Sequence, residues 1–146
     1  MVELTTELKV SAHELYNAII QQSVMEIKQK TGEDVSAEEI EKNGYKYKVT
    51  KKRGKEFYEA SINIRKPIAD KLFTSSYNSP QGLYEMRYEI EALEEYLCQL
   101  HFTQKNGAKD EAKGFWNWYA SRKMKSNFRK LADYIISQRD KEQKEG

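Results

Sequence analysis

The residue types that most often do chemistry are scarce in this chain. It has one cysteine, Cys98, and two histidines, His13 and His101. A zinc site needs three or four such ligands at close spacing, so we expect no metal site. His13 falls in the first turn of an expected helix, and His101 points away from the apolar side of its strand, so both are expected at the surface. Cys98 falls on the apolar side, where a buried thiol is unreactive.

The sequence also lacks motifs for nucleotide binding and for acid–base or nucleophilic catalysis. The seven glycines are scattered at expected turns and form no phosphate-binding loop, so no nucleotide or other cofactor is expected. Glu85, Glu89 and Glu91 alternate with Arg87 along one strand, which is typical of a solvated charge ladder rather than of paired acid–base carboxylates. No base lies beside a nucleophile in any recognisable motif. The sequence therefore identifies no catalytic residue.

The composition indicates a globular domain. The chain has 146 residues, of which 38% are apolar and 33% charged, and its net charge is +2. Any electrostatic function must therefore come from local clusters of charge. No apolar run is long enough to span a bilayer, the N-terminus lacks the apolar core of a signal peptide, and a lone cysteine forms no intrachain disulfide. These features predict a cytoplasmic protein.

Two capping signals locate the first helices that must position any site. After an alternating strand at residues 3–10, Ser11 and Glu14 have the form of a capping box, and the apolar stripe that follows ends near Gly32. Ser36 and Glu39 repeat the pattern for a short helix.

The rest of the chain predicts a sheet and a long helix. About five antiparallel strands are expected, with the best alternation at residues 84–90 and a weaker strand at 68–77. A long helix then runs from about residue 112 to 138. The domain is expected to cover residues 1–138, with 139–146 as a frayed, charged tail. This order predicts an α+β fold in which the last helix covers one face of a curved antiparallel sheet.

Three segments carry a resemblance to a known superfamily. They are the opening strand leading into VSAHELYNAI, the segment TGEDVSAEEIEKNGYKY, and the aromatic, basic start of the last helix. Together they resemble the START-like (SRPBCC, polyketide-cyclase-like) helix-grip superfamily, and within it a small uncharacterised bacterial family. The resemblance implies a sheet wrapped around the long C-terminal helix, two shorter helices after the first strand, and a cavity between sheet and helix for an apolar ligand. It carries over no catalytic residues.

Tyrosines favour such a cavity. The chain has ten, and strand alternation places several of them on the inward face of the sheet. A buried tyrosine hydroxyl needs a partner, so these residues favour a partly polar interior. The alternative is a dry core whose hydroxyls reach the rim of the sheet. The predicted cavity residues are Tyr47, Tyr58, Tyr84, Met86, Tyr88, Tyr96, Asn117, Ser121, Met124 and Phe128.

The segment FWNWYASRKMKSNFRK, residues 115–130, combines aromatic and basic residues on the last helix. The apolar stripe expected to face the core is Ala120, Met124, Phe128, Leu131 and Ile135. The opposite face could be covered by the protein's own elements, by a second copy in a dimer, or by an anionic membrane or single-stranded nucleic acid. The small net charge argues against membrane and nucleic acid as partners. The predicted interaction-face residues are Phe115, Trp118, Tyr119, Arg122, Lys123, Arg129 and Lys130.

The sequence thus predicts a non-catalytic module that holds a small apolar or amphipathic ligand between the sheet and the last helix. One alternative is a protein-interaction or dimerisation module that uses the aromatic, basic face of that helix. A second alternative is a cyclase- or hydrolase-like enzyme, which an inward-facing carboxylate or histidine would favour.

Overall fold

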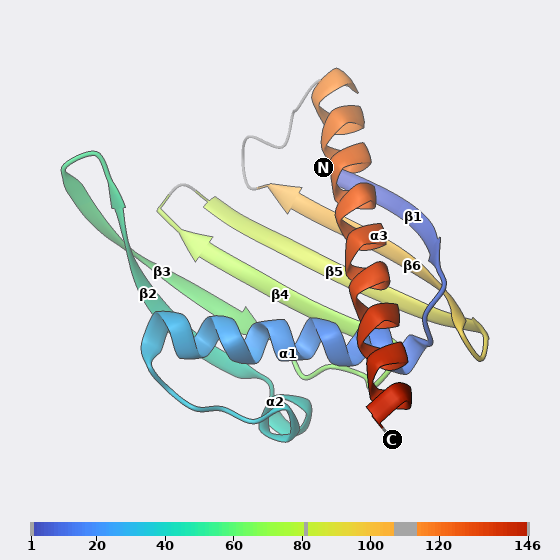
Figure 1. Cartoon of the computed structure of the whole chain (residues 1–146). Helices are drawn as coiled ribbons and strands as arrows, with labels where there is room; N and C mark the ends of the chain where they lie inside the picture. Colours follow the sequence, from blue (N-terminus) through green and yellow to red (C-terminus); the bar gives the residue numbers. More distant parts are fainter. Residues whose placement is uncertain (1, 81, 107–113, 146) are drawn as a thin grey trace.

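The computed structural model describes residues 2–80, 82–106 and 114–145, with only the backbone at residues 106, 114–118, 144 and 145. Within these ranges the two long helices α1 and α3 lie over one face of a six-stranded antiparallel sheet, whose strand order is β1-β6-β5-β4-β3-β2, and the short helix α2 packs beside α1 (Figure 1). The predicted α+β order, with a long last helix over the sheet, is confirmed. The strands are β1 (Val2–Leu8), β2 (Tyr45–Arg53), β3 (Glu56–Ile64), β4 (Leu72–Ser79), β5 (Gly82–Glu94) and β6 (Leu97–Asn106), and the helices are α1 (Ala12–Thr31), α2 (Ala37–Asn43) and α3 (Gly114–Glu145).

Both predicted capping signals start helices. The Ser11 hydroxyl accepts a hydrogen bond from the Glu14 amide at 3.0 Å, and the Glu14 carboxylate accepts one from the Ser11 amide at 2.9 Å. This capping box satisfies two backbone donors that the first turn of α1 would otherwise leave unpaired. Gly32 ends α1 with a φ of +77°, in the left-handed region that favours glycine. The Ser36 hydroxyl accepts from the Glu39 amide at 3.2 Å and starts α2.

The core lies between the inner face of the sheet and the helices. β1 alternates buried and exposed residues along its whole length, with Leu4 and Leu8 facing inward. Phe128 of α3 packs against Tyr88 of β5 and Phe102 of β6, with ring centroids 6.1 Å and 5.2 Å apart. These rings attach α3 to the β1–β6–β5 half of the sheet, while α1 crosses the same face beside it (Figure 1).

Three boundaries differ from the predictions. β4 begins at Leu72, because residues 68–71 form a turn closed by the Leu72 amide on the Ile68 carbonyl at 2.9 Å. Tyr96, predicted inside, lies in the β5–β6 turn and is 47% exposed, so that prediction was wrong. α3 continues beyond residue 138 to Glu145. It has tertiary partners there, since Arg139 forms an ion pair with Glu14 at 3.1 Å and lies over the Tyr96 ring.

The two predicted faces of α3 are largely as expected. Phe128 is buried, and the other four residues of the predicted stripe pack partly buried against the core. Ala132 also belongs to the core, and Lys125, between the two predicted sets, is half-buried. Of the predicted interaction face, the side chains of Phe115 and Trp118 lie outside the described part of the structure. The exposed members are Tyr119, Arg122, Lys123, Arg129 and Lys130.

The outer face of the sheet carries the predicted charge ladder. Arg87 and Glu89 form an ion pair at 2.6 Å. His101 points outward, as predicted, with Nε2 at 3.0 Å from Glu3 and Nδ1 at 3.3 Å from Glu89. The hydrogen bond to Glu3, helped by the one to Glu89, raises the pKa of the His101 imidazole. These are surface pairs across β1, β6 and β5, so they adjust stability with pH rather than define a site.

A candidate ligand groove between α1 and the sheet

The second half of α1 presents a polar row to the sheet. Ser23, Glu26 and Lys30 follow Ile19 at spacings of three or four residues, so all four share one face of the helix. Leu15 and Ile19, on the first half of this face, are buried in the core. From Ser23 onward the face becomes polar and its side chains are only partly covered. This face of the helix therefore leaves a groove over the sheet, while the neighbouring face, with the fully buried Ile27, continues to pack.

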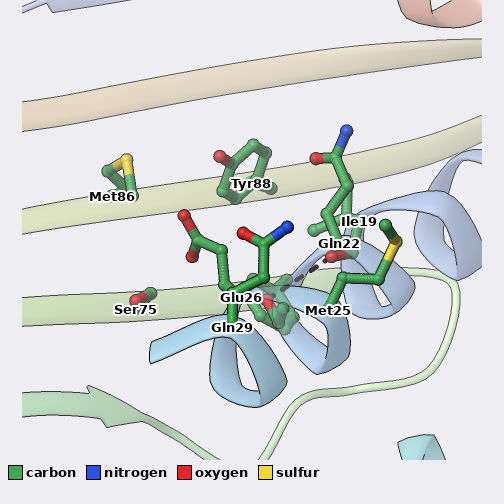
Figure 2. A pocket seen from close by; sticks show the side chains of 10 residues that line it. Ile19, Gln22, Met25, Glu26, Gln29, Ser75, Met86 and Tyr88 are labelled. Carbon is green, nitrogen blue, oxygen red and sulfur yellow. Dashed lines mark hydrogen bonds between the residues drawn. The ribbon is translucent and has the colours of Figure 1, made fainter. Parts of the chain in front are cut away.

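The central section of this groove lies between α1 and strands β4 and β5, and its cavity volume is about 340 Å³. Ser75, Met86 and Tyr88 form its floor, and Gln22, Glu26 and Gln29 extend from α1 toward that floor (Figure 2). Ile19, Phe73 and Met25 supply further apolar surface.

The groove continues toward β2 and β3 as a hairpin section of about 330 Å³. Tyr47 and Lys51 of β2, Tyr77 of β4 and Tyr84 of β5 line it, with Lys30 on the helix side. The two sections share Ser23, Glu26, Ser75 and Met86, so they are parts of one groove. Each section falls within the usual range for sites that take small molecules.

Tyrosine hydroxyls and one carboxylate set the electrostatics. Burial, and secondarily the negative charge of Glu26, raise the pKa of Tyr47 and of Tyr88 to about 12. Both hydroxyls therefore stay protonated near neutral pH and can donate hydrogen bonds. Among the described residues Glu26 has a loose ion pair with Lys30, at 3.9 Å between Nζ and Oε1, and more than half of its side chain is exposed. Its carboxylate is accessible to a bound molecule.

Four of the predicted cavity residues line the groove, namely Tyr47, Tyr84, Met86 and Tyr88. The groove itself differs from the prediction, which placed a cavity between the sheet and the last helix. Among the described α3 side chains, none lines either section. The described part of α3 closes against the sheet because Phe128 fills the space above β5 and β6 by packing against Tyr88 and Phe102. The groove opens under α1 instead, because that helix becomes polar where it crosses the sheet.

The remaining predicted cavity residues have other roles. The Ser121 hydroxyl donates to the Glu3 carbonyl at 3.3 Å and links α3 to β1. Met124 packs partly buried against the core, as part of the same helix face as Phe128. Tyr58 lies beyond the groove on β3, where its hydroxyl is hydrogen-bonded to Tyr77. The side chain of Asn117 lies outside the described part of the structure.

The α1 residues of the groove were not predicted as site residues. The signal was present in the sequence, because Ser23 and Glu26 continue at helical spacing a stripe that begins with Leu15 and Ile19. A stripe that changes from apolar to polar midway indicates a helix that packs at one end and lines an opening at the other. The predicted stripe instead continued as apolar to near Gly32.

The residues with reactive side chains lie away from the groove. Cys98 is fully buried, and burial raises the pKa of its thiol to about 11, so the reactive thiolate is scarce near neutral pH. His13 is an exposed residue paired with Asp70 at 2.9 Å. Over the described ranges, no cluster of histidine, cysteine and carboxylate side chains could hold a metal ion. No helix there combines the length and the apolar character that crossing a bilayer requires.

Solved structures with the same architecture define the class of fold. The chain is similar to the Aha1 dimer from Colwellia psychrerythraea (TM-score 0.54, 13% identity, covering 92% of this chain and 94% of that one). It is also similar to Ara h 8.0201 (TM-score 0.54, 11% identity, covering 92% and 96%) and to a conserved protein from Geobacillus kaustophilus (TM-score 0.50, 18% identity, covering 92% and 94%). The open antiparallel sheet with a long C-terminal helix is therefore the helix-grip fold of START-like proteins.

The family follows from the sequence. Residues 2–124 match the model of the domain of unknown function DUF3284, and the chain belongs to that family. Among curated proteins, no sequence matches significantly. The predicted resemblance to a START-like family of unknown function is thus confirmed.

Proposed function

We propose that this protein is a non-catalytic binding module that holds a small amphipathic molecule in the groove between α1 and the sheet. The observation that carries the proposal is the lining of the groove, where apolar side chains alternate with hydroxyls, amides and one carboxylate. An apolar part of the ligand would lie on Met86, Phe73 and Ile19. Its polar part would face the Tyr47 and Tyr88 hydroxyls and Glu26, which offer both donors and an acceptor.

A matched pair of variants on β4 tests the groove. Ser75 faces the groove and lines both of its sections, while its neighbour Ser76 faces the other side of the sheet. Ser75→Phe should fill the space where the sections meet, whereas Ser76→Phe adds the same side chain on the opposite face. The probe is N-phenyl-1-naphthylamine, a neutral apolar fluorophore whose binding is followed by its fluorescence.

We expect saturable binding by the native protein, at least about tenfold weaker in Ser75→Phe and unchanged in Ser76→Phe. A tenfold loss corresponds to about 1.4 kcal/mol, less than the value of burying one aromatic ring. Circular dichroism should show that both variants fold. Equal binding by both variants and the unchanged protein would place the fluorophore elsewhere and refute the groove as its site.

An enzyme of cyclase or hydrolase type is the second candidate, because Glu26 is a carboxylate that faces the groove beside two tyrosine hydroxyls. Native mass spectrometry of protein purified from cells distinguishes the two functions. If Glu26 acts as a base, Glu26→Gln should retain an unconverted molecule of a mass that the unchanged protein does not carry. If the module only binds, any retained mass should be the same in both.

A contact through the outer face of α3 remains the third candidate. Tyr119 is 51% exposed near the basic residues Arg122 and Lys123, so the described part of the chain leaves about half of this residue uncovered. The similar solved structure of Aha1 from Colwellia psychrerythraea is that of a dimer. Sedimentation equilibrium of the unchanged chain and of Tyr119→Ala tests whether this face joins two copies.

A further inference from the structure

The β2–β3 hairpin concentrates the positive charge of the chain. Residues 46–59, here called the basic hairpin, contain six basic and two acidic side chains and therefore carry a net charge of +4. The whole chain carries only +2, so the remainder is net negative. No acidic residue occurs between Glu41 and Glu56. The small net charge of the chain hides this local cluster.

The basic hairpin also projects from the body of the protein. β3 pairs with β4 only over Ser61–Ile64, whereas its pairing with β2 continues to Glu56 opposite Arg53. The outer part of the hairpin is therefore a two-stranded ribbon without a third strand, and it extends away from the sheet (Figure 1). Such a ribbon gains little from the core and presents its side chains to whatever lies beyond it.

An exposed phenylalanine lies near the tip of this ribbon. Phe57 is 69% exposed, and it pairs in register with Lys52, whose Nζ lies 5.8 Å from the ring centroid. Arg53 and Lys55 lie at the turn, and within the described part of the chain neither has an acidic side chain at ion-pair distance. A large apolar ring surrounded by cations is typical of surfaces that enter the headgroup region of an anionic bilayer.

The opposite end of the sheet carries the opposite charge. The strands alternate in direction, so the β5–β6 turn lies at the far end of the sheet from the β2–β3 turn (Figure 1). Residues 91–95, which lead into that turn, contain three glutamates and no basic residue. This charge separation would orient the molecule with the hairpin toward a negatively charged surface.

We propose that the basic hairpin docks the protein on an anionic lipid surface, with Phe57 inserted among the headgroups. Five of the six basic residues are lysines, which act as point charges toward phosphates rather than as bidentate readers of nucleic-acid bases. The apolar ring at the tip has no hydrogen-bonding group for a base edge. These features favour a lipid surface over a nucleic acid. The proposal does not depend on what the groove binds.

The test measures flotation of the full chain with vesicles of phosphatidylglycerol and phosphatidylcholine, and with phosphatidylcholine alone, at near-physiological ionic strength. The hairpin variant combines Lys52→Gln, Arg53→Gln and Lys55→Gln. Its matched control combines Lys123→Gln, Arg129→Gln and Lys130→Gln on the exposed face of α3. Both variants lose three positive charges, so they have the same net charge of −1, reduced from +2. Phe57→Ser removes the ring alone.

We expect binding only to the anionic vesicles, weakened by added salt. The hairpin variant should bind roughly 100-fold more weakly, since each cation near such a surface contributes about fivefold, while the α3 variant should lose much less. Phe57→Ser should cost about tenfold. Equal losses in the two triple variants, or no binding of the unchanged chain, would overturn the proposal. The proposal would also be overturned if the unchanged chain bound a single-stranded oligonucleotide but not vesicles, and the hairpin variant lost that binding. The hairpin would then be a nucleic-acid surface.

Discussion

Replacing Phe128 by alanine removes the ring that joins α3 to the sheet. The ring is 6% exposed and contacts Tyr88 and Phe102, so its loss leaves a cavity that the rigid sheet cannot close. Buried phenylalanine-to-alanine changes cost about 3–5 kcal/mol, which includes the lost burial and the cavity. Domains of this kind are stable by only about 5–15 kcal/mol, so the variant should remain folded but with a much smaller margin.

Urea unfolding followed by circular dichroism measures this loss. We expect a lower midpoint with an unchanged slope, which would indicate a change in stability rather than in the extent of unfolding. Lys130→Ala is the matched control, since Lys130 is exposed on the same helix, and it should change stability by less than about 0.5 kcal/mol. A loss below about 1 kcal/mol for Phe128→Ala, or equal losses for the two variants, would refute the assignment of this ring as the anchor of α3.

Two further predictions concern a close backbone contact and a pH dependence. Gly44→Ala should cost more than about 2 kcal/mol by urea unfolding, because the added methyl would lie 2.5 Å from the Ile64 carbonyl oxygen at a φ of +68°. Gly54→Ala, with a similar φ and open space around it, should cost only about 1 kcal/mol, and equal costs would contradict the contact argument. The raised pKa of His101 implies a stabilising contribution that is complete below about pH 6.5 and is lost as the pH rises through the folded-state pKa. His101→Asn should therefore lower the free energy of unfolding, measured with urea at pH 5.5, by less than about 1 kcal/mol for such an exposed pair. At pH 8.5 the two proteins should be equally stable, and the same pH dependence in both would contradict this.

The groove and the basic hairpin are neighbours in the structure. Lys51 lines the hairpin section of the groove and belongs to the same ribbon as Phe57. A protein docked through the hairpin would therefore hold that end of the groove close to the lipid surface. The two proposals can fail separately, because the Ser75→Phe test uses no vesicles and the flotation test requires no ligand.

Local patterns in the sequence were sufficient for most of the fold. The capping boxes, the alternation in the strands and the apolar stripe of α3 depend on neighbours within a few residues, so they predicted the element order, both helix starts and the outward position of His101. The same alternation placed Tyr47, Tyr84, Met86 and Tyr88 on the inner face. Tyr96 was misplaced because nothing local showed where the β5–β6 turn would fall.

The position of the groove was decided by the tertiary structure. Both α1 and α3 carry stripes that could lie over a cavity, and the sequence alone does not say which helix closes against the sheet. Phe128 meets Tyr88 and Phe102 across long distances in the chain, and this packing seals one side. The polar row from Ser23 to Lys30 keeps the other side open. Likewise, the basic residues of β2 are visible in the sequence, but they become a projecting surface only because β4 pairs with so little of β3. Contacts between distant segments decide both features, because local periodicity tells which face is apolar but not what will cover it.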